Sequence, residues 1–360
     1  EVQLCPKARQ AIKHLVADGR YDFIETGSLI SIKKNVKDIL IPSEEHRIKI
    51  YPMDFEEFLW AIDNPIAIEF IHESYEKRKP LGDIAHRKIM SLFREYMAVG
   101  GMPQAVQAFT NGATFSEIDK VKYDIIKLYE EDLNKNNDNG KAKNIYKSVP
   151  SQLGKNKKKF TLAQINKNSR FRNYADSIDF VSESMILNIC NNVSDPGIFL
   201  ELSKIDEKFK LYMGDTGLLI TCIANNKEIM DEDIYKLIVL GKTSENLRMV
   251  YENMAAQILR SKGYKLYFHE FYDETPRKKS NGEDTFTPRR CEIDFLIVKN
   301  KKLCPIEIKS SKSKKHESFD VFKEKYKLKI QDKYVIHTKD YKEEGGIIYL
   351  PIYMLGCIDG

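Results

Sequence analysis

Residues 292–309 read EIDFLIVKNKKLCPIEIK. Two apolar runs flank the polar segment Lys299–Lys302, which is short enough to be a turn. The pattern predicts two antiparallel strands joined as a β-hairpin. Successive side chains of a strand point to opposite faces, so we expect Glu307 and Lys309 on one face and Ile306 and Ile308 on the other.

This hairpin brings together side chains that can do chemistry. If Asp294 points to the same face as Glu307, the two carboxylates supply oxygen ligands for Mg²⁺ or Mn²⁺. Lys309 would then orient or activate a water for attack on a phosphodiester. The simpler alternative is a solvated salt bridge, because an E-x-K triplet arises by chance in many lysine-rich chains.

The segments around the hairpin predict an α/β module. A helix is expected over Leu247–Arg260, where Val250, Met254 and Ile258 recur at helical spacing. The charged segment Asp273–Arg290 is expected to be an exposed loop. The β-rich runs of the module are Tyr264–His269, Cys291–Val298, Leu303–Lys309, Lys333–His337 and Gly346–Pro351.

The first residues of the chain predict a helix followed by strands. An amphipathic pattern through Ala8 and Val16 precedes an apolar run, Tyr21–Ser28, that we expect to form a buried strand. Arg47–Pro52 is expected to be a short strand that proline stops. A buried strand so near the first residue needs neighbours, so we expect the chain to start in the middle of a domain.

Helices are expected in the region that follows. Asp54 and Glu57 have the spacing of a capping box at the start of a helix that runs through Trp60. A second helix is expected over Ile84–Val99, where Gly100-Gly101-Met102-Pro103 stops it. A third helix is expected to have Ser116 as its N-cap.

The middle of the chain has the pattern of a winged helix-turn-helix. Two helical patterns lie between Thr161 and Leu187, broken near Asn168-Ser169, and the alternating segment Lys208–Met213 would form the ribbon. DNA contact is one function of such a module, and protein contact is the other. The basic residues that would meet DNA phosphates are Lys155, Lys157, Lys158 and Lys159 before the first helix and Arg170 and Arg172 at the second. Asp176 and Asp179 on that second helix would repel the backbone.

Composition excludes several classes of protein. With 360 residues, 42% hydrophobic and 31% charged, the chain is too long for one small module and too apolar to be broadly disordered. The net charge of +5 does not by itself indicate a nucleic-acid binder. The six cysteines form no C-x-x-C pair, and there is no signal peptide or membrane-spanning run, so we expect a cytoplasmic protein with reduced cysteines.

Several fragments, taken in order, resemble the AAA-type ATPases of bacteria and archaea that carry a C-terminal DUF4143 domain. The DUF4143 end is in turn similar to the PD-(D/E)xK nucleases, whose pattern here is Asp294, Glu307 and Lys309, with Glu252 as the acidic residue of the preceding helix. The matching fragments are Glu1-Val2-Gln3, Thr26-Gly27-Ser28, Tyr51–Phe58, Tyr96–Pro103, Phe209–Tyr212, Asp215–Leu219, Glu252-Asn253, Glu292–Phe295 and Ile306–Lys309.

The resemblance implies an intact protein that binds and hydrolyses ATP with Mg²⁺. Glu1 would polarise the attacking water at the end of a Walker B strand, and Thr26 or Ser28 would be the sensor hydroxyl. Arg47 stands where the family has an arginine before the proline-containing strand. Gly241-Lys242-Thr243 lacks the glycine that a P-loop needs five residues earlier, so we expect this chain not to hydrolyse ATP as it stands.

The expected fold is therefore α/β and multidomain. It comprises the end of a P-loop ATPase domain over 1–80, a helical lid over 81–135, a winged-helix-like region over 136–230 and a restriction-endonuclease-like α/β domain over 231–360. Three functions stay open. They are an ATPase that moves a nuclease-like domain bound to DNA or a partner protein, a non-catalytic DNA- or protein-binding module, and a nuclease that needs only Mg²⁺ or Mn²⁺.

Overall fold

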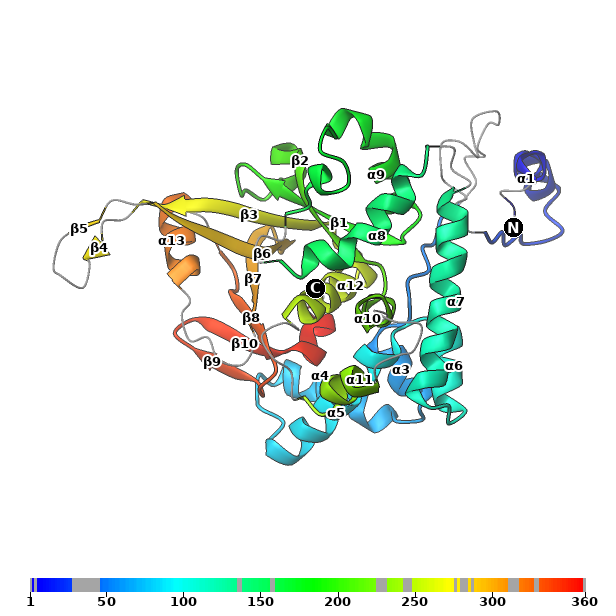
Figure 1. Ribbon diagram of the computed structural model, residues 1–360. Coiled ribbons are helices and arrows are strands. Elements are labelled where there is room, and N and C mark those ends of the chain that lie inside the picture. The colour runs from blue at the N-terminus through cyan, green and yellow to red at the C-terminus, as the bar shows by residue number, and fades with distance from the viewer. Residues whose placement is uncertain are drawn as a thin grey trace.

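The computed structural model describes residues 2, 5–27, 46–134, 138–155, 159–224, 232–241, 248–274, 277–278, 284–285, 288–309, 317–326 and 330–358. Within them an eight-stranded mixed sheet has the order β2-β1-β3-β6-β7-β8-β10-β9, and helices gather mainly on one side of it (Figure 1). The α/β class expected from the sequence is confirmed. The strands are β1 Leu187–Val193, β2 Lys204–Met213, β3 Leu266–Asp273, β6 Arg289–Lys299, β7 Lys302–Ile308, β8 Tyr334–His337, β9 Lys342–Glu344 and β10 Ile347–Pro351.

The sheet has an apolar core on both faces. Helix α12 (Arg248–Ser261) buries Met254 and Ile258 in the same core as Ile306 and Ile308. Helix α13 (Glu317–Tyr326) contributes Phe319 and Phe322 to a second core with Ile293 and Leu303. Strands buried on both faces read as continuous apolar runs, as β6 and β7 do.

The predicted hairpin and its neighbours are confirmed. Strands β6 and β7 pair antiparallel around a turn at Asn300-Lys301, with Phe295 opposite Ile306. All five β-rich runs of the last third form strands, and the helix expected over Leu247–Arg260 is α12. Half of the expected loop Asp273–Arg290 lies outside the described residues. The described part contains a small two-stranded sheet, β4 (Arg277–Lys278) with β5 (Asp284–Thr285).

The remaining helices form the other part of the molecule, shown mostly blue to green in Figure 1. Residues from α3, α5, α6, α7, α8 and α10 share one core, in which Phe58, Phe93 and Tyr96 are fully or almost fully buried. The helices are α1 Pro6–Asp18, α3 Phe55–Ala61, α4 Pro65–Glu76, α5 Asp83–Val99, α6 Pro103–Thr110, α7 Phe115–Asn134, α8 Lys141–Leu153, α9 Ala175–Glu183, α10 Thr216–Ala224 and α11 Glu232–Val239. None of the helices described is long and apolar enough to cross a membrane.

Helices α3 and α7 begin with side-chain caps. At α3 the Asp54 side chain accepts from the Glu57 amide at 3.0 Å, and the Glu57 carboxylate accepts from the Asp54 amide at 2.8 Å, so the predicted capping box is confirmed. At α7 the prediction is wrong by two residues. Thr114, rather than Ser116, exchanges the reciprocal bonds with Glu117, because threonine and glutamate three residues apart satisfy two helix amides together.

Two expected strands are absent from the described residues. Residues 21–27 and 46–51 have no strand structure, and Ile24, Ile48 and Ile50 are 92%, 75% and 78% exposed. A strand forms only where a neighbour satisfies its backbone groups. In residues 21–27 the Val2 amide donates to the Thr26 carbonyl at 3.2 Å, and no ladder of strand hydrogen bonds is described there.

The middle region also differs from the expected helix pair. Residues 161–167 contain only the 3₁₀ turn η2 (Leu162–Gln164), and a second such turn, η3 (Phe171–Asn173), precedes helix α9. The segment proposed as the ribbon is strand β2, which pairs with β1. Strand β1 also pairs in parallel with β3, so residues 187–213 belong to the same sheet as the last third.

Three glycines, Gly100, Gly101 and Gly217, let backbones approach where helices meet. A methyl group on Gly101 would lie 2.2 Å from the Met53 carbonyl oxygen, and one on Gly217 would lie 2.6 Å from the Cα of Gly100. Asp215 holds this junction, since its carboxylate accepts from the amides of Gly101 at 2.6 Å and Leu218 at 2.9 Å. We call Met53, Gly100, Gly101, Asp215 and Gly217 the glycine junction.

A buried lysine lies beside the glycine junction. Lys122 of α7 is fully buried, and its ammonium donates to the Ala98 carbonyl at 2.7 Å and to the Tyr235 hydroxyl at 2.8 Å. Burial lowers the pKa of Lys122 to about 8, although the nearby carboxylates of Asp119 and Asp215 oppose this shift. The ammonium thus ties α5, α7 and α11 together at a cost in solvation.

Replacement of Gly101 tests the junction. Gly101→Ala forces a side chain into the Met53 backbone, so we expect a loss of about 3 kcal/mol in the free energy of unfolding. Gly197→Ala is the control, because a methyl group there meets nothing within 4 Å. Urea unfolding measures both variants, and equal stability of the two would contradict the close approach.

The pH dependence of stability tests Lys122. Its folded pKa of about 8 lies below the unfolded value of 10.5, so the unfolded chain holds more protons above pH 8. We therefore expect this lysine to make the protein more stable by about 1 kcal/mol per pH unit from pH 8 to about pH 9.5. The difference between wild type and Lys122→Met in urea unfolding isolates the effect, and a difference that stays constant with pH would refute it.

Candidate functional site

The residues of the nuclease-like pattern converge at the end of the β6–β7 hairpin. In the ladder Phe295 lies opposite Ile306, so the register places Asp294 beside Glu307 on the neighbouring strand. Lys309 and Glu307 share a face as predicted, and their Nζ and Oε2 atoms lie 2.9 Å apart. The predicted pairing of a carboxylate with an amine on one face is therefore confirmed.

The Asp294 carboxylate already has partners within the protein. Its Oδ2 atom accepts from the Ile308 amide at 2.8 Å, which closes the end of the hairpin where the regular ladder stops. The Arg248 guanidinium lies 3.6 Å from the same oxygen. Because Arg248 begins α12, this ion pair also fixes the helix start to the sheet.

Glu307 is buried and has an unusual electrostatic environment. Burial raises its pKa to about 7, and the neighbouring Lys309 only partly offsets the shift. Asp294 raises the pKa further, which shows that the two carboxylates act on one another. The Ser318 hydroxyl of α13 donates to the Glu307 carboxylate. A carboxyl with a pKa near 7 is about half protonated at neutral pH.

Glu252 belongs to a second group on the α12 side of the sheet. The fully buried Lys210 ammonium lies 2.6 Å from Glu292 Oε1 and 3.4 Å from Glu252 Oε1. The Tyr212 hydroxyl donates to Glu252 at 2.8 Å. Burial alone would lower the pKa of Lys210, but Glu292 and Asp294 outweigh it and raise the pKa, so the lysine is a permanent internal cation.

Four residues of this site were not singled out from the sequence. They are Lys210, Arg248, Glu292 and Ser318. Lys210 alternates with apolar residues in β2, which is the pattern of a solvent-exposed lysine, whereas the structure buries it. Arg248 and Ser318 are distant in sequence from the hairpin and reach it only through the packing of α12 and α13.

The contacts divide the acidic residues between Lys210 on one side and the pair Lys309 and Arg248 on the other. Lys210 serves Glu252 and Glu292, while Lys309 and Arg248 serve Glu307 and Asp294. Among the residues described here, no three His, Cys, Asp or Glu side chains form a group that could hold a metal ion. The arrangement can exchange a proton at Glu307, whose pKa lies near 7.

The other predicted site residues do not join this group. Glu1, Ser28, Lys157 and Lys158 lie outside the described residues, as does most of 241–247. Thr26 is exposed in a segment without regular structure. Arg170 and Arg172 are both exposed at the turn η3.

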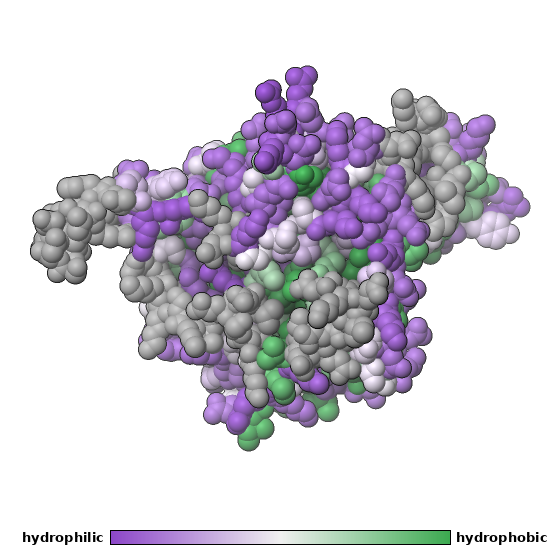
Figure 2. Space-filling model, viewed as in Figure 1, coloured by the Kyte–Doolittle hydropathy of each residue, from purple (hydrophilic) through white to green (hydrophobic). Residues whose placement is uncertain are grey.

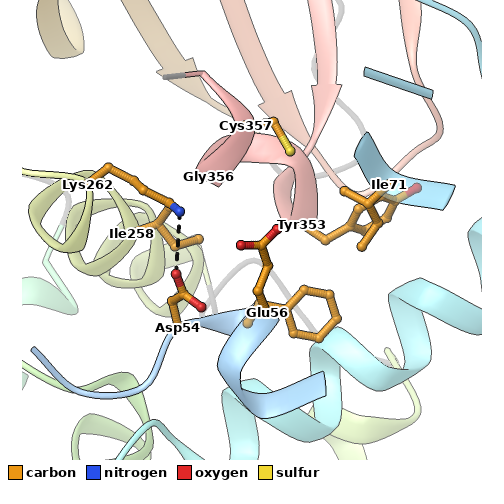
Figure 3. Close-up of a pocket in the computed structure, with 9 residues that line it drawn as sticks. Asp54, Glu56, Ile71, Ile258, Lys262, Tyr353, Gly356 and Cys357 are labelled. Atoms are coloured by element: carbon orange, nitrogen blue, oxygen red, sulfur yellow. Dashed lines mark ion pairs between the residues drawn. The ribbon is translucent and has the colours of Figure 1, made fainter. Parts of the chain in front are cut away.

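A separate pocket lies between α3 and the end of the chain. It is lined by Asp54, Phe55, Glu56, Ile71, Ile258, Lys262, Tyr353, Gly356 and Cys357. Figure 3 shows the Asp54 carboxylate facing the Lys262 ammonium, 3.5 Å away. The pocket therefore lies where α3, α12 and the last turn, η6 (Ile352–Cys357), meet.

Three family models match the chain. An AAA domain (AAA_14) matches residues 1–59, a domain of unknown function (DUF8612) matches 90–229 and another (DUF4143) matches 248–355. No curated protein and no solved structure matches. The DUF4143 match contains Glu252, Asp294, Glu307 and Lys309. The resemblance to AAA-type ATPases with a C-terminal DUF4143 domain is therefore confirmed, and the two matches suggest an ATPase-like protein.

Proposed function

We propose that this chain belongs to an ATPase-like protein whose C-terminal domain has a nuclease-like fold and serves to bind rather than to cleave. One observation carries the proposal. Each acidic side chain of the nuclease-like pattern already contacts a cation or a backbone amide of the protein. Glu252 meets Lys210, Asp294 meets Arg248 and the Ile308 amide, and Glu307 meets Lys309.

A divalent cation fits these residues poorly. Mg²⁺ needs oxygen ligands in near-ideal octahedral geometry. It would have to displace the Ile308 amide from Asp294 and compete with the charges of Arg248 and Lys309. Glu252, the third acidic residue of the pattern, is fully buried beside Lys210. We therefore assign no metal-dependent step to this site.

A metal-dependent nuclease is the alternative, and two observations favour it. Asp294 and Glu307 lie side by side, and their mutual repulsion contributes to the raised pKa of Glu307. Two carboxylates that share a site are often arranged for a cation. Lys309 at 2.9 Å from Glu307 also stands where an amine would position a water.

DNA is one partner that the exposed basic side chains of the middle region would suit. Arg170 and Arg172 are exposed on the same turn, which is the arrangement that backbone contact requires. The exposed Lys167 adds charge nearby, whereas Asp176 on α9 opposes it. A protein partner stays the second possibility for this surface.

ATP with Mg²⁺ is the cofactor that the AAA match implies for the intact protein. Thr26 is the one described residue of the implied nucleotide contacts, and it is exposed with its carbonyl bound by the Val2 amide. The described part of residues 1–59 contains helix α1 and the start of α3 and no strand. No step of the proposal therefore depends on nucleotide.

Titration of metal into the protein, together with a plasmid-nicking assay, tests whether the C-terminal domain cleaves DNA. We expect neither Mn²⁺ binding by calorimetry nor nicking of supercoiled plasmid, because the acidic residues are already compensated. Asp294→Ala should then behave like wild type. If metal binding and nicking occur in wild type and in the surface control Asp206→Ala but vanish in Asp294→Ala, the domain is a nuclease and the proposal is wrong.

Paired arginine replacement tests DNA contact. Arg170→Ala with Arg172→Ala removes two phosphate contacts, so the slope of log affinity against log salt should fall by about 2. Arg87→Ala with Lys88→Ala, an exposed basic pair on α5, is the matched control. Fluorescence anisotropy with a labelled duplex gives both slopes, and equal slopes in the two double variants would exclude this surface.

A further inference from the structure

Residues 54–76 form an acidic segment in a chain whose net charge is +5. The segment contains no lysine and no arginine, and the basic run Lys77-Arg78-Lys79 follows it directly. It covers α3 and α4 and the turn between them. Its acidic residues are Asp54, Glu56, Glu57, Asp63, Glu69, Glu73 and Glu76.

The same segment exposes large apolar side chains. Trp60, Ile66 and Phe70 are 62%, 61% and 49% exposed. Ile66 and Phe70 are four residues apart and therefore share one face of α4. Trp60 precedes the turn that leads into this helix. The face of the molecule seen in Figure 2 is mostly hydrophilic, with apolar side chains showing in its centre and lower part.

The hydrophobic core does not use these exposed side chains, because other residues of the same two helices fill it. Helix α3 buries Phe55, Phe58 and Leu59, and α4 buries Ala67 and Ile71. The two helices are held together by the pairing of Glu56 with His72 and by the bond from the Asn64 amide to the Leu59 carbonyl. The outer apolar side chains are thus presented on a fixed support.

Acidic residues accompany the apolar ones. Asp63 and Glu69 are exposed on the turn and on α4, and Glu73 lies one turn after Glu69 in an ion pair with Lys77. The negative charge opposes contact with DNA phosphates and with anionic lipid headgroups. It favours a partner whose apolar side chains are flanked by lysine or arginine.

We infer that Trp60, Ile66 and Phe70 form a docking surface for an amphipathic helix of a partner protein, with a stripe of apolar residues bordered by lysine or arginine. The helix would cover the three apolar side chains and place its basic residues beside Asp63 and Glu69. Amphipathic helices bind apolar grooves in this manner through side chains three and four residues apart. Complementary charges would raise the association rate and select the basic partner.

Trp60 makes the proposal directly measurable, because it is the one tryptophan of the chain. The probe is a synthetic amphipathic helix with a leucine stripe flanked by lysines, and its matched partner has glutamates in place of the lysines. We expect the lysine peptide to shift the Trp60 emission to shorter wavelength as the indole leaves water. Binding should weaken severalfold from about 0.05 M to about 0.5 M salt.

Variants identify the surface. Ile66→Asp and Phe70→Asp should each lower the affinity for the lysine peptide about tenfold, and Glu69→Lys should weaken it while leaving the apolar contact intact. Leu202→Asp is the control, because Leu202 is 86% exposed but belongs to η4 (Leu200–Ser203). Circular dichroism confirms that each variant is folded.

Three results would overturn the inference. The first is equal binding of the lysine and glutamate peptides, which would mean that charge plays no part. The second is an unchanged affinity in both Ile66→Asp and Phe70→Asp. The third is a Trp60 emission that shifts with protein concentration alone while the chain sediments as a dimer, since a second copy would then be the occupant.

Discussion

The close approach of two backbones at the glycine junction is the constraint on which the rest of the structure depends. Gly101 touches Met53 at the start of α3, and Gly217 touches Gly100 at the end of α5, with no room for a methyl group at either contact. The Asp215 carboxylate, bound by two backbone amides, occupies the corner between them. Gln257 of α12 donates to Asp215 at 3.4 Å, so the sheet domain is tied to the same corner.

In the candidate site, the charges of buried carboxylates are balanced by cations of the protein itself. A buried carboxylate is costly unless a cation or a hydrogen-bond donor accompanies it. Lys210, Arg248 and Lys309 supply that compensation from three different elements, which are strand β2, the first residue of helix α12 and the end of strand β7. Removal of any one of them would leave a buried carboxylate with hydrogen-bond donors but without its cation.

Local patterns predicted much of this fold, and long-range packing set the rest. The hairpin, α12 and the capping box at Asp54 depend on residues close in sequence, so periodicity and capping rules were sufficient for them. The strands expected at 21–28 and 47–52 are absent from the described residues 21–27 and 46–52, because an apolar run forms a strand only when a neighbour pairs with it. Asp294, Glu307 and Lys309 were found through their spacing, whereas Lys210 was missed because its burial depends on the sheet order that joins β2 to β1.

The shared sheet has a consequence for how this protein can change over evolution. Strands β1 and β2 lie within the segment matched by DUF8612, and β3, β6 and β7 lie within the segment matched by DUF4143, yet β1 pairs directly with β3. A recombination event between the two segments would leave each half with an unpaired strand edge, and such edges promote aggregation. The two segments are therefore expected to be inherited together and to accumulate substitutions as one unit, although separate family models describe them.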